Sequence, residues 1–153
     1  MSHDPARAES LVRVARLQME PKVGELEANI ADSVTRIDAA AARGAQLIVL
    51  PELCSSGYVF ETRDEAYVLA EEVPHGPANR VWMQAAQRHR CWIVAGIAER
   101  AGAKLFNSAV LVGPEGHIET FRKMHSWAAE HLNFEPATSA SPSMQRRSGA
   151  SRC

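Results

Sequence analysis

The sequence lacks the features that mark membrane proteins, disulfide-stabilised proteins and nucleic-acid-binding proteins. It has no apolar run of membrane-spanning length, and residues 1–10 are polar without a hydrophobic segment. Its three cysteines, Cys54, Cys91 and Cys153, are far apart and form no Cys-x-x-Cys pair, which argues against a disulfide framework or a zinc site. A net charge of -1 offers no basic face to nucleic acid or to an anionic membrane. We therefore expect a soluble cytoplasmic protein that binds neither.

The chain has room for one globular core. Its 153 residues are 46% hydrophobic and 23% charged, a composition typical of a folded domain. The chain is too short for two domains of ordinary size. We expect residues 1–10 to form a polar tail before a single domain.

The first part of the chain has the pattern of a β-α-β unit. Apolar residues concentrate in residues 11–19, which predicts a first strand. Between Glu25 and Arg43 they recur at steps of three and four, which predicts an amphipathic helix that Gly44 ends. Residues 47–50 are all apolar and predict a buried strand. Two strands joined by a helix are expected to be parallel, with a right-handed crossover.

The second part predicts helices followed by an antiparallel hairpin. We expect a short helix over residues 63–72 and another from Gly76-Pro77 to about His89, since proline suits the first helical position. Residues 91–98 predict a buried strand. Residues 104–112 and 117–123 predict two strands joined by the four-residue turn 113–116, which has glycine at both ends. The whole pattern indicates an α/β layered domain.

Two charged residues follow predicted strands. Pro51 ends the buried strand 47–50 and presents Glu52 just past its carboxyl end, where open α/β sheets hold their chemistry. We expect Glu52 to be partly desolvated, which would raise its pKa toward that of a useful general base. Lys123 stands at the end of the last predicted strand. We expect the Glu52 carboxylate and the Lys123 ammonium to converge within about 8 Å.

Three segments resemble the nitrilase (carbon-nitrogen hydrolase) superfamily. They are Pro51-Glu52-Leu53 with Gly57-Tyr58, the hairpin 106–116, and Arg122-Lys123-Met124-His125. The resemblance runs from Val12 to about Pro136, so residues 11–136 are identified as a partial carbon-nitrogen hydrolase domain. It implies an α/β fold, the N-terminal half of an α-β-β-α sandwich that has four layers when complete and dimeric. A homo-oligomer is therefore expected of the full-length protein.

The resemblance also implies a reaction. Members of the superfamily hydrolyse nitriles, amides or N-carbamoyl groups through a Glu-Lys-Cys triad. Glu52 matches the general base, Lys123 the lysine that stabilises the tetrahedral intermediate, and Glu130 a second glutamate that orients the site. The substrate would be a small amide or nitrile, and no metal or organic cofactor is implied. His125 and His131 are too isolated to suggest a metal site.

No cysteine matches the nucleophile of the superfamily, which lies in a strand-end motif such as Ile-Cys-Tyr-Asp. Cys153 follows the polar run 145–152, which predicts no buried strand. Cys54 is interpreted as a small semi-buried side chain, and Cys91 as part of the core. The second half of the sandwich has no counterpart either. We expect this polypeptide to be inactive, with an uncovered sheet face that favours aggregation.

The segment 137–153 departs from the superfamily pattern. Its Ser, Arg, Pro and Gly composition suits a disordered tail or a coding sequence read in the wrong frame. With one base restored before the codon for Ala137, each TCN serine codon would contribute to a codon for Phe, Leu, Ile or Val, where family strands need apolar residues. Other functional interpretations stay open: a catalytically silent paralogue or interaction subunit, and a glutaminase or N-acyltransferase domain of the same fold.

Overall fold

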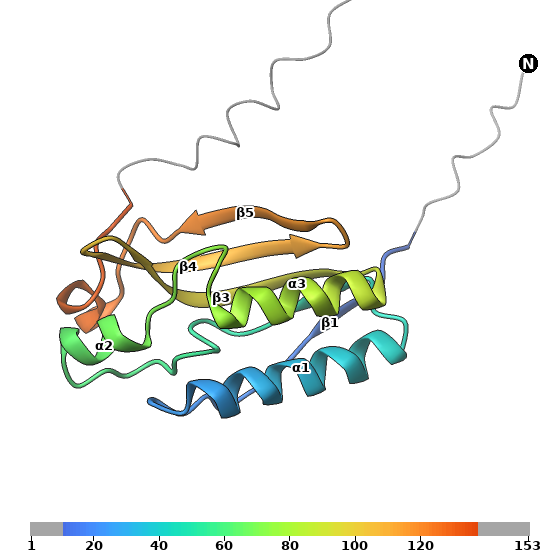
Figure 1. Cartoon of the computed structure of the whole chain (residues 1–153), viewed down its shortest axis with the longest axis horizontal. Helices are drawn as coiled ribbons and strands as arrows, with labels where there is room; N and C mark the ends of the chain where they lie inside the picture. The colour runs from blue at the N-terminus through green and yellow to red at the C-terminus, as the bar shows by residue number, and fades with distance from the viewer. Residues whose placement is uncertain (1–10, 138–153) are drawn as a thin grey trace, which may run out of the picture.

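The computed structural model describes residues 11–137. Figure 1 shows the elements, which in chain order are β1 (Val14–Arg16), α1 (Leu26–Ala42), β2 (Leu47–Val49), α2 (Arg63–Leu69), α3 (Pro77–His89), β3 (Trp92–Ala101), β4 (Lys104–Gly113), β5 (Gly116–Arg122) and the 3-10 helix η1 (Ala128–Leu132). The segments predicted as helices and strands all form, with shifts at their ends. Residues 1–10 and most of the segment 137–153, for which we predicted tails, lie outside the described residues.

One mixed sheet has the order β1-β2-β3-β4-β5. The strands β1, β2 and β3 are parallel, whereas β4 runs antiparallel to both β3 and β5. The parallel β-α-β unit and the hairpin are therefore confirmed. The first strand is shorter than expected because only residues 14–16 pair with β2. The hairpin turn is also tighter, since Gly113 pairs with Gly116 and leaves a two-residue connection between them.

The hydrophobic core lies between one face of the sheet and the helices α1 and α3 (Figure 1). Ile48 of β2 and Ile93 of β3 point into it and are fully buried. Trp82 of α3 is also fully buried, and its indole N–H donates to the Ser33 hydroxyl of α1 at 2.9 Å. Pairing this polar atom across the two helices removes the cost of burying it.

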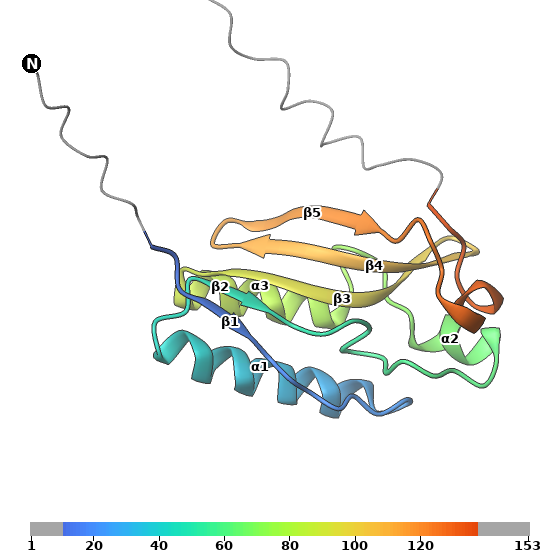
Figure 2. The same cartoon turned by 180° about the vertical axis from the view of Figure 1, so that it is seen from behind.

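The other face of the sheet is uncovered within residues 11–137, as Figure 2 shows for β2, β3 and β4. Side chains alternate along a strand, so Trp92 lies on the opposite face from the buried Ile93. Trp92 and Phe121 are both 44% exposed. An open face with large apolar side chains agrees with our expectation of an uncovered sheet. Within the described range, no helix is both long enough and apolar enough to span a bilayer.

Candidate active site

Glu52 is held at the carboxyl end of β2 by backbone contacts with β3. The Leu50 N–H donates to Val94 O at 2.8 Å, the Gly96 N–H donates to Pro51 O at 3.1 Å, and the Cys54 N–H donates to Gly96 O at 3.0 Å. The contact is so close that a Cβ atom added to Gly96 would lie 2.5 Å from the Cα of Glu52. Glycine at position 96 is therefore required for the turn that presents Glu52.

Lys123 follows β5 and reaches the same place. Its backbone N–H donates to Asn107 O at 2.8 Å, which continues the pairing of β5 with β4 past the last residue of the strand. Its ammonium donates to Glu52 Oε1 at 2.8 Å and to Glu130 Oε1 at 3.0 Å, and lies 2.9 Å from Glu130 Oε2. The predicted convergence of Glu52 and Lys123 is confirmed as a direct ion pair, and Glu130 joins it.

The Glu130 carboxylate is saturated with hydrogen bonds. Oε1 accepts from the Tyr58 hydroxyl at 2.7 Å and from Lys123, and Oε2 accepts from the Trp127 backbone N–H at 2.9 Å. Burial would raise the pKa of this carboxyl, but the hydrogen bonds from Trp127, Tyr58 and Lys123 outweigh it and lower the pKa below its ordinary 4.5. Glu130 is thus a fixed anion, with both oxygens occupied.

The same contacts shift the pKa values of the two groups that donate to Glu130, the Lys123 ammonium and the Tyr58 phenol. Burial would lower the pKa of the Lys123 ammonium, but its hydrogen bonds to Glu52 and Glu130 raise it above 10.5. The hydrogen bond to Glu130, together with burial and the nearby negative charges, raises the pKa of the Tyr58 phenol to about 12. Near neutral pH both groups therefore keep their protons and donate.

Sequence reasoning missed Asn107 and Tyr58 as members of this site. The Asn107 amide donates to Glu52 Oε1 at 2.6 Å and to Glu130 Oε1 at a longer 3.4 Å. Both residues lie within the segments that carry the family resemblance. Neither is charged at neutral pH, so a search for acids, bases and nucleophiles passes over them. Their place in those segments was the available signal.

Glu52 differs from Glu130 in exposure and in free acceptor capacity. Its Oε1 accepts from Lys123 and Asn107, whereas its Oε2 accepts no hydrogen bond from the described residues. The Glu52 side chain is 42% exposed, against 8% for Glu130. The Glu52 side chain is therefore partly buried, as we expected from its apolar sequence context, and the open sheet face beside it leaves the rest in solvent.

A cavity of about 280 Å³ adjoins the polar group. Glu52, Asn107 and Lys123 contribute its polar wall, and Val94, Ala109 and Phe121 are among its apolar residues. The apolar residues belong to the uncovered face of the sheet. A small polar molecule placed here would meet an unoccupied carboxylate oxygen and a cation over an apolar floor.

No described cysteine is placed to act as a nucleophile in this cavity. Cys54 is fully buried, more than the semi-buried position expected for it, and its thiol donates to Gly96 O at 3.3 Å. Burial raises its pKa to about 12. Cys91 lies in the core as predicted, with 1% exposure. Cys153 is outside the described residues.

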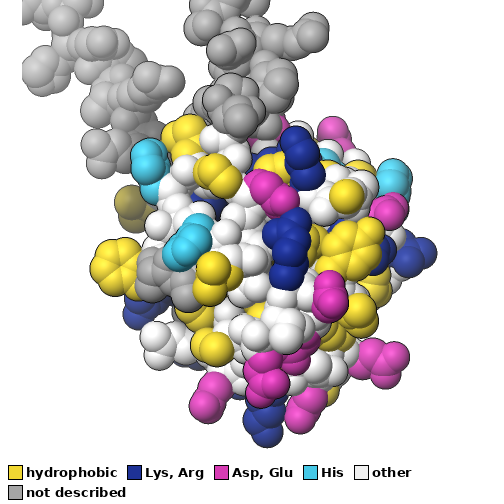
Figure 3. All heavy atoms as spheres, turned by 90° about the vertical axis from the view of Figure 1, so that its left-hand side faces the viewer, with side chains coloured by type: hydrophobic (Ala, Val, Ile, Leu, Met, Phe, Trp, Pro, Cys, Tyr) yellow, Lys and Arg dark blue, Asp and Glu magenta, His cyan; other side chains and the backbone are white. Residues whose placement is uncertain are grey.

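Two further observations concern binding of ions. Within residues 11–137, no group of three or more His, Cys, Asp or Glu side chains has the geometry to hold a metal. Figure 3 shows the end of the molecule that carries α2, where acidic and basic side chains are intermixed with apolar ones. This end therefore presents no surface of a single sign.

The match to a family model defines the class of protein. The model for carbon-nitrogen hydrolases matches residues 13–150. The chain therefore belongs to the carbon-nitrogen hydrolase family. The matched range continues past Pro136, the boundary that we drew from sequence motifs.

Named relatives agree with this assignment. The chain is 44% identical over 126 residues to a nitrilase of Pyrococcus abyssi, covering 82% of this chain and 48% of the relative. It is 30% identical over 125 residues to an (R)-stereoselective amidase of a Pseudomonas species, covering 82% of this chain and 44% of the relative. The chain thus spans about half the length of these relatives.

Solved structures share the fold. An N-terminal amidase bound to a Gln-Gly peptide superimposes with a TM-score of 0.75 at 23% identity, over 82% of this chain and 31% of that one. A CN-hydrolase superfamily protein from Xanthomonas campestris gives a TM-score of 0.73 at 22% identity, over 84% and 47% of the two chains. The expected α/β fold of the nitrilase type is confirmed.

Proposed function

We propose that this chain supplies the general base and the cationic group of a hydrolase that cleaves a nitrile, amide or N-carbamoyl carbon–nitrogen bond. The observation that carries the proposal is the position of Lys123 between two carboxylates of unequal character. Glu130 is saturated and acts as an anchor, whereas Glu52 keeps one oxygen free toward the cavity. Glu52 is the base because only it has an oxygen free to take a proton.

The nucleophile would be a cysteine thiol supplied from outside residues 11–137. Glu52 takes the thiol proton, and the sulfur forms a bond to the substrate carbon. The electron pair displaced from the carbon moves to the amide oxygen or the nitrile nitrogen, where the Lys123 ammonium stabilises it. For an amide, Glu52 returns the proton to the leaving nitrogen, ammonia or an amine departs, and a thioester remains.

Hydrolysis of the thioester uses the same groups. Glu52 takes a proton from water, and the hydroxide adds to the thioester carbon while Lys123 again stabilises the oxyanion. The carbon–sulfur bond then breaks, the thiolate recovers a proton from Glu52, and the acid product leaves. Glu130, Asn107 and Tyr58 take no proton in this cycle. They hold the Lys123 ammonium and the Glu52 carboxylate in position.

Relatives narrow the choice of substrate only to a class. The names of the matched relatives include a nitrilase, an amidase and an omega-amidase, all of which act on bonds to nitrogen. A small amide or nitrile is therefore the proposed substrate here, in a homo-oligomeric full-length enzyme. A silent paralogue or interaction subunit is the competing function, favoured by the absence of a suitably placed thiol among residues 11–137.

A chimera tests the site assignment. Residues 1–136 of this chain, joined to the remainder of the Pyrococcus abyssi nitrilase, would combine the described site with the second half of a 44% identical relative. We expect release of ammonia from a panel of amides and nitriles. Glu52→Gln and Lys123→Met should each lower kcat/KM by at least about 10³-fold. Lys104→Met, at an exposed position outside the cavity, serves as the matched control and should retain activity.

The chimera and the native chain together separate the two functions. An active chimera that keeps its rate in the Glu52→Gln variant would refute the assignment of Glu52 as the base. The chain alone should release no ammonia above background, because neither cysteine among residues 11–137 is placed to attack a substrate in the cavity. Turnover by the chain that disappears in Cys153→Ala would show instead that the terminal cysteine serves as the nucleophile.

We also propose that one missing base separates this reading frame from that of the family after Pro136, although the family match itself continues to residue 150. The apolar residues that the shifted serine codons would restore support this proposal. Sequencing the locus tests it. If the bases beyond the codon for Cys153 do not encode a strand-end motif such as Ile-Cys-Tyr-Asp in the restored frame, the proposal fails and the silent paralogue becomes the preferred function.

A further inference from the structure

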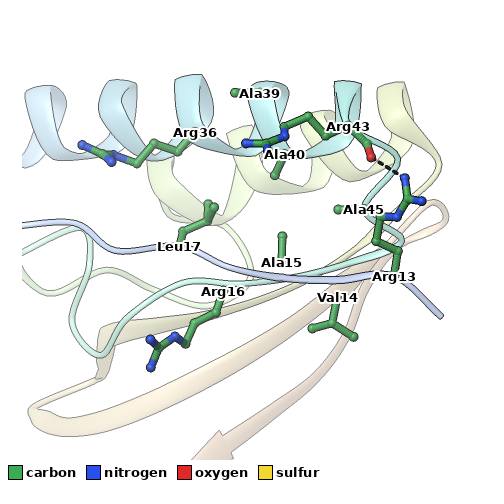
Figure 4. A pocket seen from close by; sticks show the side chains of 10 residues that line it. All are labelled: Arg13, Val14, Ala15, Arg16, Leu17, Arg36, Ala39, Ala40, Arg43 and Ala45. Atoms are coloured by element: carbon green, nitrogen blue, oxygen red, sulfur yellow. Dashed lines mark hydrogen bonds between the residues drawn. The ribbon is translucent and has the colours of Figure 1, made fainter.

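A groove of about 570 Å³ lies between the edge strand β1 and the helix α1. Figure 4 shows Ala15 and Leu17 pointing from β1 toward α1, while Val14 and Arg16 point to the other side of the strand. Ala39, Ala40 and Ala45 add to the apolar floor. The groove shares no lining residue with the cavity beside Glu52, so the two are separate features.

The strand beside this groove has a free edge. Among residues 11–137, β1 is the outermost strand of the sheet and pairs only with β2. The Leu17 N–H donates to Val49 O and Arg13 O accepts from the Leu47 N–H, so alternate residues of β1 turn their backbone groups toward β2. The residues between them, Val14 and Arg16, therefore direct their N–H and C=O groups outward. A row of unpaired backbone groups is a template for another strand.

The groove is also basic, although the near-zero net charge of the chain led us to expect no basic face. Arg13, Arg16, Arg36 and Arg43 line it, and its lining contains no Asp or Glu. Arg36 pairs with Asp32 outside the lining at 2.9 Å, and the Arg13 guanidinium donates to Arg43 O at 2.6 Å (Figure 4). A carbonyl does not neutralise the Arg13 charge, and no carboxylate from residues 11–137 pairs with it. An occupant that binds here has to bring negative charge.

We propose that this groove is a docking site for an extended acidic segment of another polypeptide, which adds to the sheet along the outer edge of β1. Backbone pairing with Val14 and Arg16 provides the attachment. Side chains of an added strand alternate between the two faces. Carboxylates on one face meet Arg36 and Arg43, and a carboxylate on the other face meets Arg16.

Charge argues against two occupants from this chain itself. Residues 138–153 contain Arg146, Arg147 and Arg152 and no acidic residue, so they do not complement the groove. A second copy that paired β1 with β1 would bring Arg13 and Arg16 against the same arginines of its partner. Like charges facing one another across paired strands are destabilising. An acidic strand from a different protein fits both the edge and the charge.

The test uses the full chain and a synthetic peptide, Ac-Thr-Glu-Val-Glu-Val-Glu-Thr-NH2, followed by backbone amide NMR and hydrogen exchange. We expect the amides of Val14 and Arg16 to shift and to become protected from exchange. A peptide with Lys in place of Glu should bind at least about tenfold more weakly. Affinity should also fall as salt is added, because the arginines are exposed.

Two variants and a control separate the contribution of backbone strand pairing to peptide binding from the contribution of the arginine charges. Val14→Pro removes only an outward N–H, which an edge strand tolerates, and should weaken binding about tenfold. Arg43→Glu should weaken it by a similar factor through charge, whereas Arg90→Glu, away from the groove lining, should bind like the native chain. An unchanged amide spectrum beyond β1 in the Val14→Pro variant shows that its fold is intact.

Three results would overturn the proposal. Binding that is unaffected by Val14→Pro would mean that the arginines attract a small anion or a carboxylate without strand pairing. Equal binding of the Glu and Lys peptides would remove the role of charge. If deletion of residues 1–10 increased peptide affinity and exposed the Val14 amide to exchange, the N-terminal segment of this chain would be the occupant.

Discussion

The Lys123 ammonium lies 2.8 Å from Glu52 Oε1, although the two residues are 71 positions apart. Each follows a strand, β2 for Glu52 and β5 for Lys123, and these strands are separated in the sheet by β3 and β4. The contact therefore depends on the whole mixed sheet. Asn107, on the intervening strand β4, also donates to Glu52 Oε1.

Removing the Lys123 charge should change the ionisation of Glu130. In Lys123→Met the carboxylate loses a hydrogen bond and a neighbouring cation, so we expect the pKa of Glu130 to rise. Carbon-13 NMR titration of the carboxyl groups measures this directly. Lys104→Met removes an exposed lysine elsewhere and should leave the titration of Glu130 unchanged. A pKa that stays low in Lys123→Met would mean that the Trp127 N–H and Tyr58 suffice.

Stability should decline toward both ends of the pH range. The folded-state pKa of Glu130 lies below 4.5, so its contribution is complete above pH 4.5 and is lost as the pH falls through the folded value. The folded-state pKa of Lys123 lies above 10.5, so its contribution is complete below pH 10.5 and is lost as the pH rises through the folded value.

Denaturant unfolding at a series of pH values measures the loss of stability on both the acid and the alkaline side. Glu130→Gln should flatten the decline on the acid side, whereas Glu115→Gln, at an exposed turn position, should keep it. If the free energy of unfolding declined just as steeply at acid pH in Glu130→Gln, the loss of stability would belong to other carboxylates.

The periodicity of apolar residues and the Pro and Gly residues at element ends predicted most of the fold, because both are local properties of the sequence. Pro51 and Gly44 mark element ends in the sequence, and Lys123 could be placed near Glu52 from the pattern of strands alone. The local pattern does not give how much of the Glu52 side chain is exposed, since that depends on the side chains that pack around it across the sheet. Tyr58 and Asn107 were missed because their role arises from hydrogen bonds between distant segments.

Gly96→Ala should displace the turn that carries Glu52. The new Cβ would lie 2.5 Å from Glu52 Cα and 2.7 Å from Pro51 O, and both of these are backbone atoms that cannot rotate away. We expect the free energy of unfolding to fall by about 2–4 kcal/mol. Gly102→Ala meets no atom within 4 Å and carries only the cost of its positive φ, about 1 kcal/mol. Equal losses in the two variants would show that the turn adjusts freely.

Tyr58 should ionise unusually late, and Glu130 should be the reason. The absorbance of tyrosinate during an alkaline titration reports each phenol, and Tyr58→Phe identifies the transition near pH 12. In Glu130→Gln the negative charge that disfavours tyrosinate is gone, so the Tyr58 transition should move toward the ordinary value of 10.0. Glu115→Gln, at the exposed turn between β4 and β5, should leave the Tyr58 transition in place.

Cys54 should be unreactive in the folded protein despite its place two residues after Glu52. Its side chain is fully buried, and burial raises its pKa to about 12, so little thiolate forms near neutral pH. A maleimide reagent should leave Cys54 unmodified until denaturant is added, and peptide mass spectrometry distinguishes it from the other two cysteines. Cys54→Ala should also leave any turnover by the nitrilase chimera within about twofold of its starting value. Rapid labelling of Cys54 in native conditions, with loss of turnover in the alanine variant, would make this thiol the nucleophile and would displace the requirement for a cysteine from outside residues 11–137.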